Sequence, residues 1–149
     1  MVPSAPSQQQ SGRLDRYELV ARMATGGMAT VWYARLRSRH GVQKPFAIKT
    51  ILPQYAGEES FRRMFLDEAL LAANVVHPNV AQIFELGEEQ GTLFIVMEWV
   101  DGTSLSNLRR SVEREGGSLD TGLVLRILAD ASAGLHAVHT AVDDTGNAL

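Results

Sequence analysis

Short runs rich in β-branched and aromatic residues, bounded by glycine or polar turns, occupy much of the first hundred residues. Runs of this length and composition are typical of strands. The first two flank the turn "ATGGMATVW", residues 24–32, so we expect them to form a hairpin. The pattern predicts five strands, at residues 17–23, 29–37, 44–52, 80–87 and 91–100.

The period of the apolar positions changes from residue 58 onward. Phe61, Phe65 and Ala69 recur at steps of four, which predicts an amphipathic helix ending near Asn74, and "HPN" at 77–79 stops it. A polar helix is expected at 105–114 and a longer one at 121–139. The longer helix carries a broad apolar face, formed by Val124, Ile127, Leu128, Ala131, Leu135 and Val138. This element order predicts an α+β fold.

Composition narrows the class of protein. The chain has 149 residues, of which 45% are hydrophobic and 21% charged, as in an ordinary soluble domain. A net charge of −3 disfavours nucleic acid as a partner. The chain has no cysteine, which excludes a disulfide framework and is compatible with the cytoplasm, where we expect the protein. No apolar run reaches the roughly 20 residues of a membrane helix, and residues 1–15 are expected to be a disordered tail.

Candidate chemistry begins with Gly26 and Gly27, which could bind phosphate or simply form a turn. Lys49 stands in an apolar strand, where a buried ammonium is costly unless an anion meets it, although it could also extend to water. The glycines lead into a strand and not a helix, which argues against Rossmann and P-loop folds. His136 and His139 have metal-ligand spacing, but no third ligand is evident.

Five features occur in one order: the glycine loop, "FAIK" with Lys49, Glu68 in the helix, "HPN", and "MEWVDG". In this order and spacing the chain resembles the N-terminal part of a bacterial-type serine/threonine protein kinase catalytic domain, over about residues 16 to 140. The ten-residue step from Glu68 to Pro78 matches the family. The family loop G-x-G-x-x-G-x-V stands here as "ATGGMATV", so alanine replaces two of its three glycines.

The resemblance implies specific roles. Lys49 would hold the α- and β-phosphates of ATP and pair with Glu68, while Gly26 and Gly27 would cover the phosphates and supply any left-handed backbone in the loop. Ser104 or Asp101 would reach the ribose. The residues implied to contact adenine, through side chain or backbone, are Val31, Ala47, Met97, Glu98, Val100 and Leu105.

The resemblance also implies a domain plan: a kinase-like N-lobe at 16–101, with a five-stranded antiparallel sheet and one helix, then the start of a helical C-lobe at 102–149. Such a domain transfers phosphoryl groups from MgATP to protein hydroxyls. The motifs H-R-D-x-x-x-x-N, D-F-G and A-P-E, which supply the base and the Mg²⁺ ligands, do not occur in the sequence. We therefore expect a truncated kinase domain, inactive alone. The alternative is a catalytically inactive module that binds a nucleotide or a protein.

Overall fold

The computed structural model describes residues 12–36 and 43–142. These residues divide into two compact units. One contains the chain up to Leu70 together with Ile83–Trp99, and the other contains Leu71–Gln82 together with the chain from Val100 onward. The first predicted domain, 16–101, therefore included a segment, Leu71–Gln82, that groups with the second unit.

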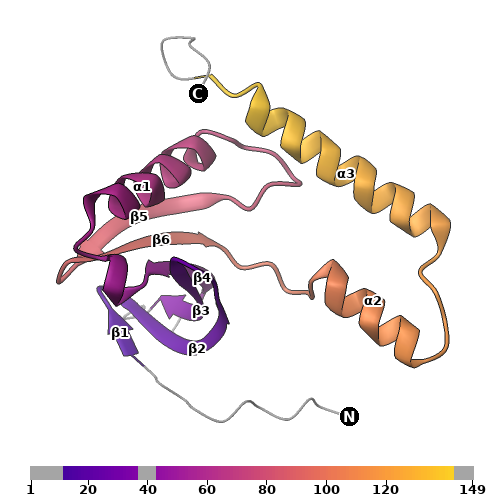
Figure 1. Cartoon of the computed structure of the whole chain (residues 1–149), viewed down its shortest axis with the longest axis horizontal. Helices are drawn as coiled ribbons and strands as arrows, with labels where there is room; N and C mark the ends of the chain where they lie inside the picture. Colours follow the sequence, from indigo (N-terminus) through magenta and orange to yellow (C-terminus); the bar gives the residue numbers. More distant parts are fainter. Residues whose placement is uncertain (1–11, 37–42, 143–149) are drawn as a thin grey trace. The chain divides into compact units, whose positions relative to one another are not determined.

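The first unit is an antiparallel sheet of six strands in the order β1-β2-β3-β4-β6-β5, with helix α1 as far as Leu70 (Figure 1). A short 3-10 helix, Pro53–Tyr55, leads from β4 toward α1. The elements are β1 (Gly12–Leu14), β2 (Tyr17–Thr25), β3 (Ala29–Leu36), β4 (Pro45–Ile51), α1 (Glu59–Ala73), β5 (Ile83–Glu89) and β6 (Thr92–Glu98).

The sheet carries an apolar cluster on each face because successive side chains in a strand point to opposite sides. In β6, Phe94 and Val96 belong to one cluster, and Leu93 and Ile95 to the other. The first cluster also contains Leu14, Tyr17, Leu19, Ala34, Phe46 and Ile48. The second contains Ala29 and Ile51 from the sheet and Phe65 and Ala69 from α1. The central strands are thus buried on both faces.

The two edges of the sheet are joined by polar contacts, so the sheet curls. The backbone N–H of Asp15, just after β1, donates to Glu89 of β5 at 2.6 Å. Tyr17 donates its hydroxyl to Glu85 at 2.6 Å, and Arg16 forms an ion pair with the same carboxylate. Burial raises the pKa of Tyr17, and the hydrogen bond to Glu85 raises it further.

Strand β1 corrects the sequence prediction of five strands and of a disordered tail at 1–15. Gly12 pairs with Leu19 and Leu14 with Tyr17, and Leu14 is buried in the cluster that contains Tyr17. A three-residue strand is too short for an alternating pattern to reveal it, and its stability comes from the partner strand and from the burial of Leu14. Residues 1–11 of the predicted tail lie outside the described residues, as does the turn at 37–42.

The second unit contains α2 (Leu105–Arg114) and α3 (Thr121–His139), at the predicted positions (Figure 1). Each begins at a side-chain cap: Ser104 accepts the N–H of Asn107 at 3.3 Å, and Asp120 accepts that of Leu123 at 3.0 Å. Helix α2 ends at Arg114, and Gly116, just beyond its C-cap, has a left-handed φ of 75°. Two hydrogen bonds of a Schellman motif close the end of this helix: the N–H of Gly116 donates to the carbonyl of Glu113 at 3.1 Å, and the N–H of Gly117 donates to that of Val112 at 3.0 Å.

The segment around "HPN" joins the second unit because it packs on α3. Asn79 donates from Nδ2 to the carbonyl of Asp130 at 2.9 Å, and its own N–H donates to Nδ1 of His77 at 3.1 Å. Gly134, the buried residue of α3, faces the same segment. A Cβ at Gly134 would lie 2.8 Å from the carbonyl oxygen of Asn79, so only glycine permits this approach without a shift.

Helix α3 is long and apolar enough, by length and composition, to cross a membrane, and only 6% of its 18-residue apolar stretch is buried. Several leucines of α3 are exposed, including Leu125 and Leu128. Charged side chains lie on it as well, since Arg126 pairs with Asp130 at 2.8 Å. The expectation that this chain has no membrane segment therefore stays a prediction.

Gly87 of β5 gives a test of the sheet packing. It pairs with Phe94 of β6, and a Cβ there would come within 2.3 Å of Cζ of Phe94 and 2.8 Å of Cε1. Because Phe94 is only 2% exposed and packs in the cluster that contains Tyr17 and Phe46, a shift of its ring would disturb that packing. We expect Gly87→Ala to lower the free energy of unfolding by about 1–3 kcal/mol, as overpacked cores do.

Urea unfolding followed by circular dichroism measures this effect. The matched control is Gly57→Ala, because a Cβ at Gly57 meets no atom within 4 Å. Equal stability of the two variants would contradict the packing described for Phe94.

Candidate functional site

A pocket of about 360 Å³ opens in the first unit beside the loop that joins β2 to β3. Residues 24–29, which comprise this loop and the adjoining ends of β2 and β3, line one side of the pocket. The other lining residues come from β3, β4 and α1, and they are Val31, Lys49, Ile51, Phe61, Phe65 and Glu68. Apart from Lys49 and Glu68, these side chains from the strands and the helix are apolar.

Lys49 and Glu68 form an ion pair in this pocket, in which the ammonium contacts both carboxylate oxygens. Nζ of Lys49 lies 2.6 Å from Oε1 and 2.7 Å from Oε2 of Glu68. The lysine side chain is 22% exposed and the glutamate side chain 57%. Nζ also lies 5.7 Å from the centre of the Phe65 ring, within the range of a cation–π contact. The ammonium is thus held by a carboxylate and an aromatic face, both from α1.

The surrounding elements explain why these two side chains meet. β4 lies between β3 and β6, and Lys49 is in register with Val31 on one side and Ile95 on the other. In α1, Phe65 and Ala69 are the buried positions, and Glu68 stands next to Ala69 in the chain. Apolar packing of the helix on the sheet therefore fixes the position of Glu68, while the sheet fixes that of Lys49.

The glycine loop is a short hairpin turn that closes on itself. Gly26 donates its N–H to the carbonyl of Ala29 at 2.8 Å, and Leu52 donates to the carbonyl of Met28 at 2.8 Å. Among the described residues, the positive φ values belong to Asp15, Gln90, Gly91 and Gly116.

The loop therefore contains none of the left-handed backbone that Gly26 and Gly27 were expected to supply if the loop had any. Both glycines have φ values that other residue types also adopt, and a Cβ at Gly27 would meet no atom within 4 Å. The fold itself does not require glycine at either position. A bare backbone at Gly26 and Gly27 instead leaves room on the pocket side of the loop for a close ligand.

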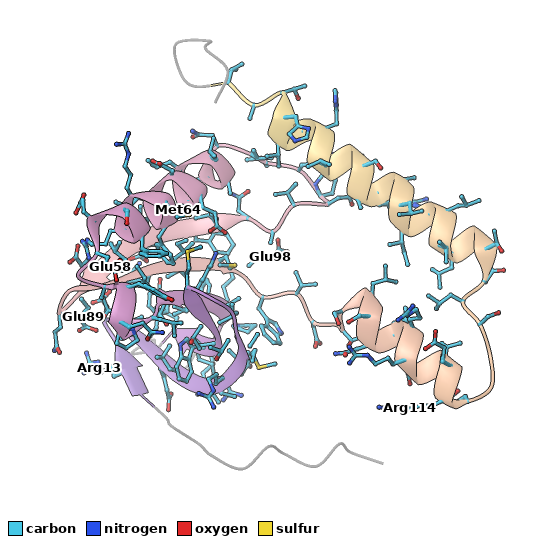
Figure 2. The ribbon with its side chains drawn as sticks, viewed as in Figure 1. Arg13, Glu58, Met64, Glu89, Glu98 and Arg114 are labelled. Atoms are coloured by element: carbon cyan, nitrogen blue, oxygen red, sulfur yellow. The ribbon has the colours of Figure 1, made fainter. Side chains whose placement is uncertain are left out.

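The residues expected to contact adenine fall into both units. In the first unit, Val31 lines the pocket, and Ala47 of β4 pairs with Met97 of β6. Met97 packs partly buried against the cluster that contains Phe65, and Glu98 ends β6, where Figure 2 labels it.

Val100, Asp101, Ser104 and Leu105 belong to the second unit. Val100 is 65% exposed, and Leu105 is the first residue of α2. The Ser104 hydroxyl caps α2, a role that the sequence analysis did not assign. The adenine and ribose contacts of these four residues stay predictions.

Two lining residues, Phe61 and Phe65, were assigned by sequence to the apolar face of the helix and not to a pocket. That face serves both purposes, because Phe65 is 5% exposed while its ring also borders the pocket. One sequence feature could have placed Phe65 at the pocket: it lies three residues before Glu68, on the same face of the helix.

Comparison with known proteins identifies the family. The family model described as protein tyrosine and serine/threonine kinase matches residues 17–141. The chain belongs to this kinase family. The resemblance inferred from the loop, Lys49, Glu68 and "HPN" is therefore confirmed.

This kinase chain is similar to several curated bacterial kinases. It is 39% identical over 133 residues to the tyrosine-protein kinase MasK of Myxococcus xanthus, covering 89% of this chain and 21% of MasK. It is 31% identical over 131 residues to the serine/threonine-protein kinase PknD of Mycobacterium tuberculosis, covering 88% of this chain and 19% of PknD. The chain thus spans about a fifth of the length of these relatives.

A solved structure confirms the fold. The kinase domain of PknI from Mycobacterium tuberculosis matches with a TM-score of 0.69 and 26% identity, over 90% of this chain and 51% of that chain. The chain is therefore a kinase domain fragment that resembles the N-terminal part of such a domain. Its curled antiparallel sheet with helices is the architecture expected from the sequence, with six strands in place of five.

The loop geometry gives a second prediction. Because Gly27 has an ordinary φ and open space around it, Gly27→Ala should change the free energy of unfolding by less than about 0.5 kcal/mol. Gly91→Ala is the matched control: a Cβ there also meets nothing within 4 Å, but its φ is +80°. This variant should lose about 1–2 kcal/mol from backbone strain alone.

Urea unfolding of the two variants beside the parent chain measures both effects. A Gly27→Ala variant as unstable as Gly91→Ala would contradict the loop conformation described above.

Proposed function

We propose that this chain binds ATP in the pocket between the glycine loop, β4 and α1, as the nucleotide-holding part of a serine/threonine protein kinase domain. The observation that carries the proposal is the ion pair between Lys49 and Glu68 inside this pocket, at 2.6 Å and 2.7 Å. An oriented ammonium that is 22% exposed, in a pocket lined mostly by apolar side chains, attracts an anion more strongly than a fully solvated one does.

The donor count of Lys49 supports a phosphate ligand. A lysine ammonium has three N–H donors, and Glu68 accepts two of the hydrogen bonds. The third donor can serve an oxygen of the α- or β-phosphate. Glu68 thus orients the ammonium without satisfying it completely, and the bare backbone of Gly26 and Gly27 lets phosphate oxygens approach.

The base and sugar contacts form the next part of the proposal. Val31, Ala47 and Met97 would contact adenine with their side chains, because Val31 lines the pocket and Ala47 pairs with Met97 in the adjoining strands. Further contacts would come from the backbone of Glu98 and Val100, from Leu105 against the base, and from Ser104 or Asp101 at the ribose.

The reaction proposed for the complete domain moves the γ-phosphoryl group of MgATP to a protein hydroxyl. The bond between the bridging oxygen and the γ-phosphorus breaks, the hydroxyl oxygen bonds to that phosphorus, ADP leaves, and the hydroxyl proton passes to a base. Lys49 and the glycine loop contribute the positioning of the phosphates. The chain's own residues therefore supply nucleotide binding and orientation.

The remaining chemistry needs groups from elsewhere. The described residues contain no cluster of three histidine or acidic side chains suited to a metal ion. The sequence also lacks the H-R-D-x-x-x-x-N and D-F-G motifs. We propose that the base and the Mg²⁺ ligands belong to a further segment of a kinase domain, and that this polypeptide alone does not transfer phosphate.

The choice of serine and threonine as acceptors rests on relatives. PknD and the serine/threonine-protein kinase PrkC of Bacillus subtilis, which is 38% identical over 90 residues, both carry that name. MasK is named a tyrosine-protein kinase. The proposal follows the larger group of named serine/threonine kinases.

ATP binding can be tested directly on the 149-residue chain by isothermal titration with ATP. We expect Lys49→Ala to weaken ATP binding by about tenfold or more, because a hydrogen bond to a charged group is lost. The matched control is Lys44→Ala: Lys44 is the other lysine of the chain, and its Nζ lies over the Phe46 and Phe84 rings instead of in the pocket.

Lys44→Ala should bind ATP with unchanged affinity. Equal ATP affinity for the Lys49→Ala variant and the parent chain would overturn the proposed site.

A further inference from the structure

One face of α2 carries a polar stripe that the nucleotide site does not use. Asn107, Arg110, Ser111 and Arg114 follow the spacing i, i+3, i+4, i+7, so they lie along a single side of the helix. Together with Thr103 and Leu108 they line a groove of about 350 Å³. Figure 2 labels Arg114 at the C-terminal end of this stripe.

The charges in this groove are not balanced within α2. Arg109 pairs with Glu113 at 3.6 Å. Arg110 donates to the amide oxygen of Asn107 at 3.4 Å, and neither Arg110 nor Arg114 has a carboxylate partner among the residues that the structure describes. Like charges four residues apart oppose helix formation. The helix dipole favours Arg114 in the last turn but gives no reason for Arg110.

The chemistry of the stripe suits carboxylates. Each guanidinium presents a planar fork of donors that matches a carboxylate. The hydroxyls of Ser111 and Thr103 and the amide of Asn107 add neutral donors beside the two arginines. Leu108 supplies an apolar surface in the same groove, so a bound segment could also bury aliphatic carbon.

The spacing of the two arginines defines what would fit. Arg110 and Arg114 are four residues apart, or about 6 Å along the helix axis. In an extended peptide, side chains at positions i and i+2 point the same way and lie about 6.5–7 Å apart. We propose that this groove of α2 binds an extended acidic protein segment with carboxylates at alternate positions, of the form Glu-x-Glu. The inference concerns peptide docking and does not require ATP binding.

Fluorescence anisotropy on the 149-residue chain tests this inference. The probe is a fluorescein-labelled peptide with the centre Glu-Ser-Glu flanked by glycines, and the matched peptide has glutamine at both glutamate positions. The account expects the chain to bind the Glu peptide and not the Gln peptide. It also expects binding to weaken as salt rises from about 0.05 to 0.5 M, because exposed charges are screened.

Five variants locate the binding. Arg110→Gln and Arg114→Gln should each weaken binding by about threefold to fivefold, and the double variant by about tenfold or more. Arg109→Gln, at the adjacent and already paired arginine, should stay within about twofold of the parent chain. Arg110→Lys keeps the charge and should bind more tightly than Arg110→Gln. Far-ultraviolet circular dichroism checks the helix content of each variant.

Several results would overturn the proposal: equal binding of the two peptides, an equal loss in Arg109→Gln, or no binding at millimolar peptide. Tighter binding of a phosphoserine peptide or of duplex DNA through the same two arginines would also overturn the choice of an acidic segment. Because the assay contains no ATP, Lys49→Ala should bind the peptide like the parent chain. A negative result for the acidic peptide would therefore leave the proposed ATP site untouched, and the two proposals can fail independently.

Discussion

The first unit depends on the burial of β4 and β6 from both faces. Ile48, Ile51, Phe94, Ile95 and Val96 are each at most 2% exposed, and they divide between the two apolar clusters of the sheet. Strands buried in this way have little freedom to slip, because a shift of one residue would exchange their side chains between two differently packed clusters. The burial therefore fixes the backbone of Lys49 before its charge has any effect.

Helix α1 follows from the same constraint. Its buried residues, Phe65 and Ala69, pack against the cluster that contains Ile51 and Ile95, and this contact sets the direction of Glu68. The ion pair is a consequence of the apolar packing. With the carboxylate more than half exposed, the pair contributes at most about 1 kcal/mol to stability. Its importance lies in orienting a cation inside a pocket.

The glycines of this chain fall into two groups, those that the fold itself requires and those that it does not. Gly91 and Gly116 have left-handed φ values, and Gly87 and Gly134 allow close contacts with Phe94 and Asn79, so the fold explains all four. Gly26 and Gly27 have neither property, apart from the turn that Gly26 closes with Ala29. In the proposed function, the need for glycine in the loop comes from the phosphates.

Local sequence patterns were sufficient to predict most of the helices and strands. Strands β2 to β6 and helices α1 to α3 lie close to their predicted positions, because apolar periodicity and caps are local signals. Strand β1 and the closure of the sheet were missed. The contact of Asp15 with Glu89 joins residues 74 apart, and such a pairing leaves no local trace in the sequence. The packing of Asn79 on α3 was missed for the same reason.

The candidate site was predictable in part. The motif order led to Lys49 and Glu68, and the structure brings them together. The negative φ of the loop glycines could not be foreseen, since φ depends on how the hairpin closes. The apolar wall formed by Phe61 and Phe65 was read as core because one helix face can pack on a sheet and border a pocket at once.

A double-mutant cycle on ATP affinity tests the central claim most directly, with Lys49→Ala, Glu68→Gln and the double variant compared with the parent chain. If Glu68 acts by orienting the ammonium, adding Glu68→Gln to Lys49→Ala should cause no further loss of affinity, while Glu68→Gln alone weakens binding. Such non-additivity is the mark of two groups in direct contact. Fully additive losses, or no effect of either single substitution, would contradict the account.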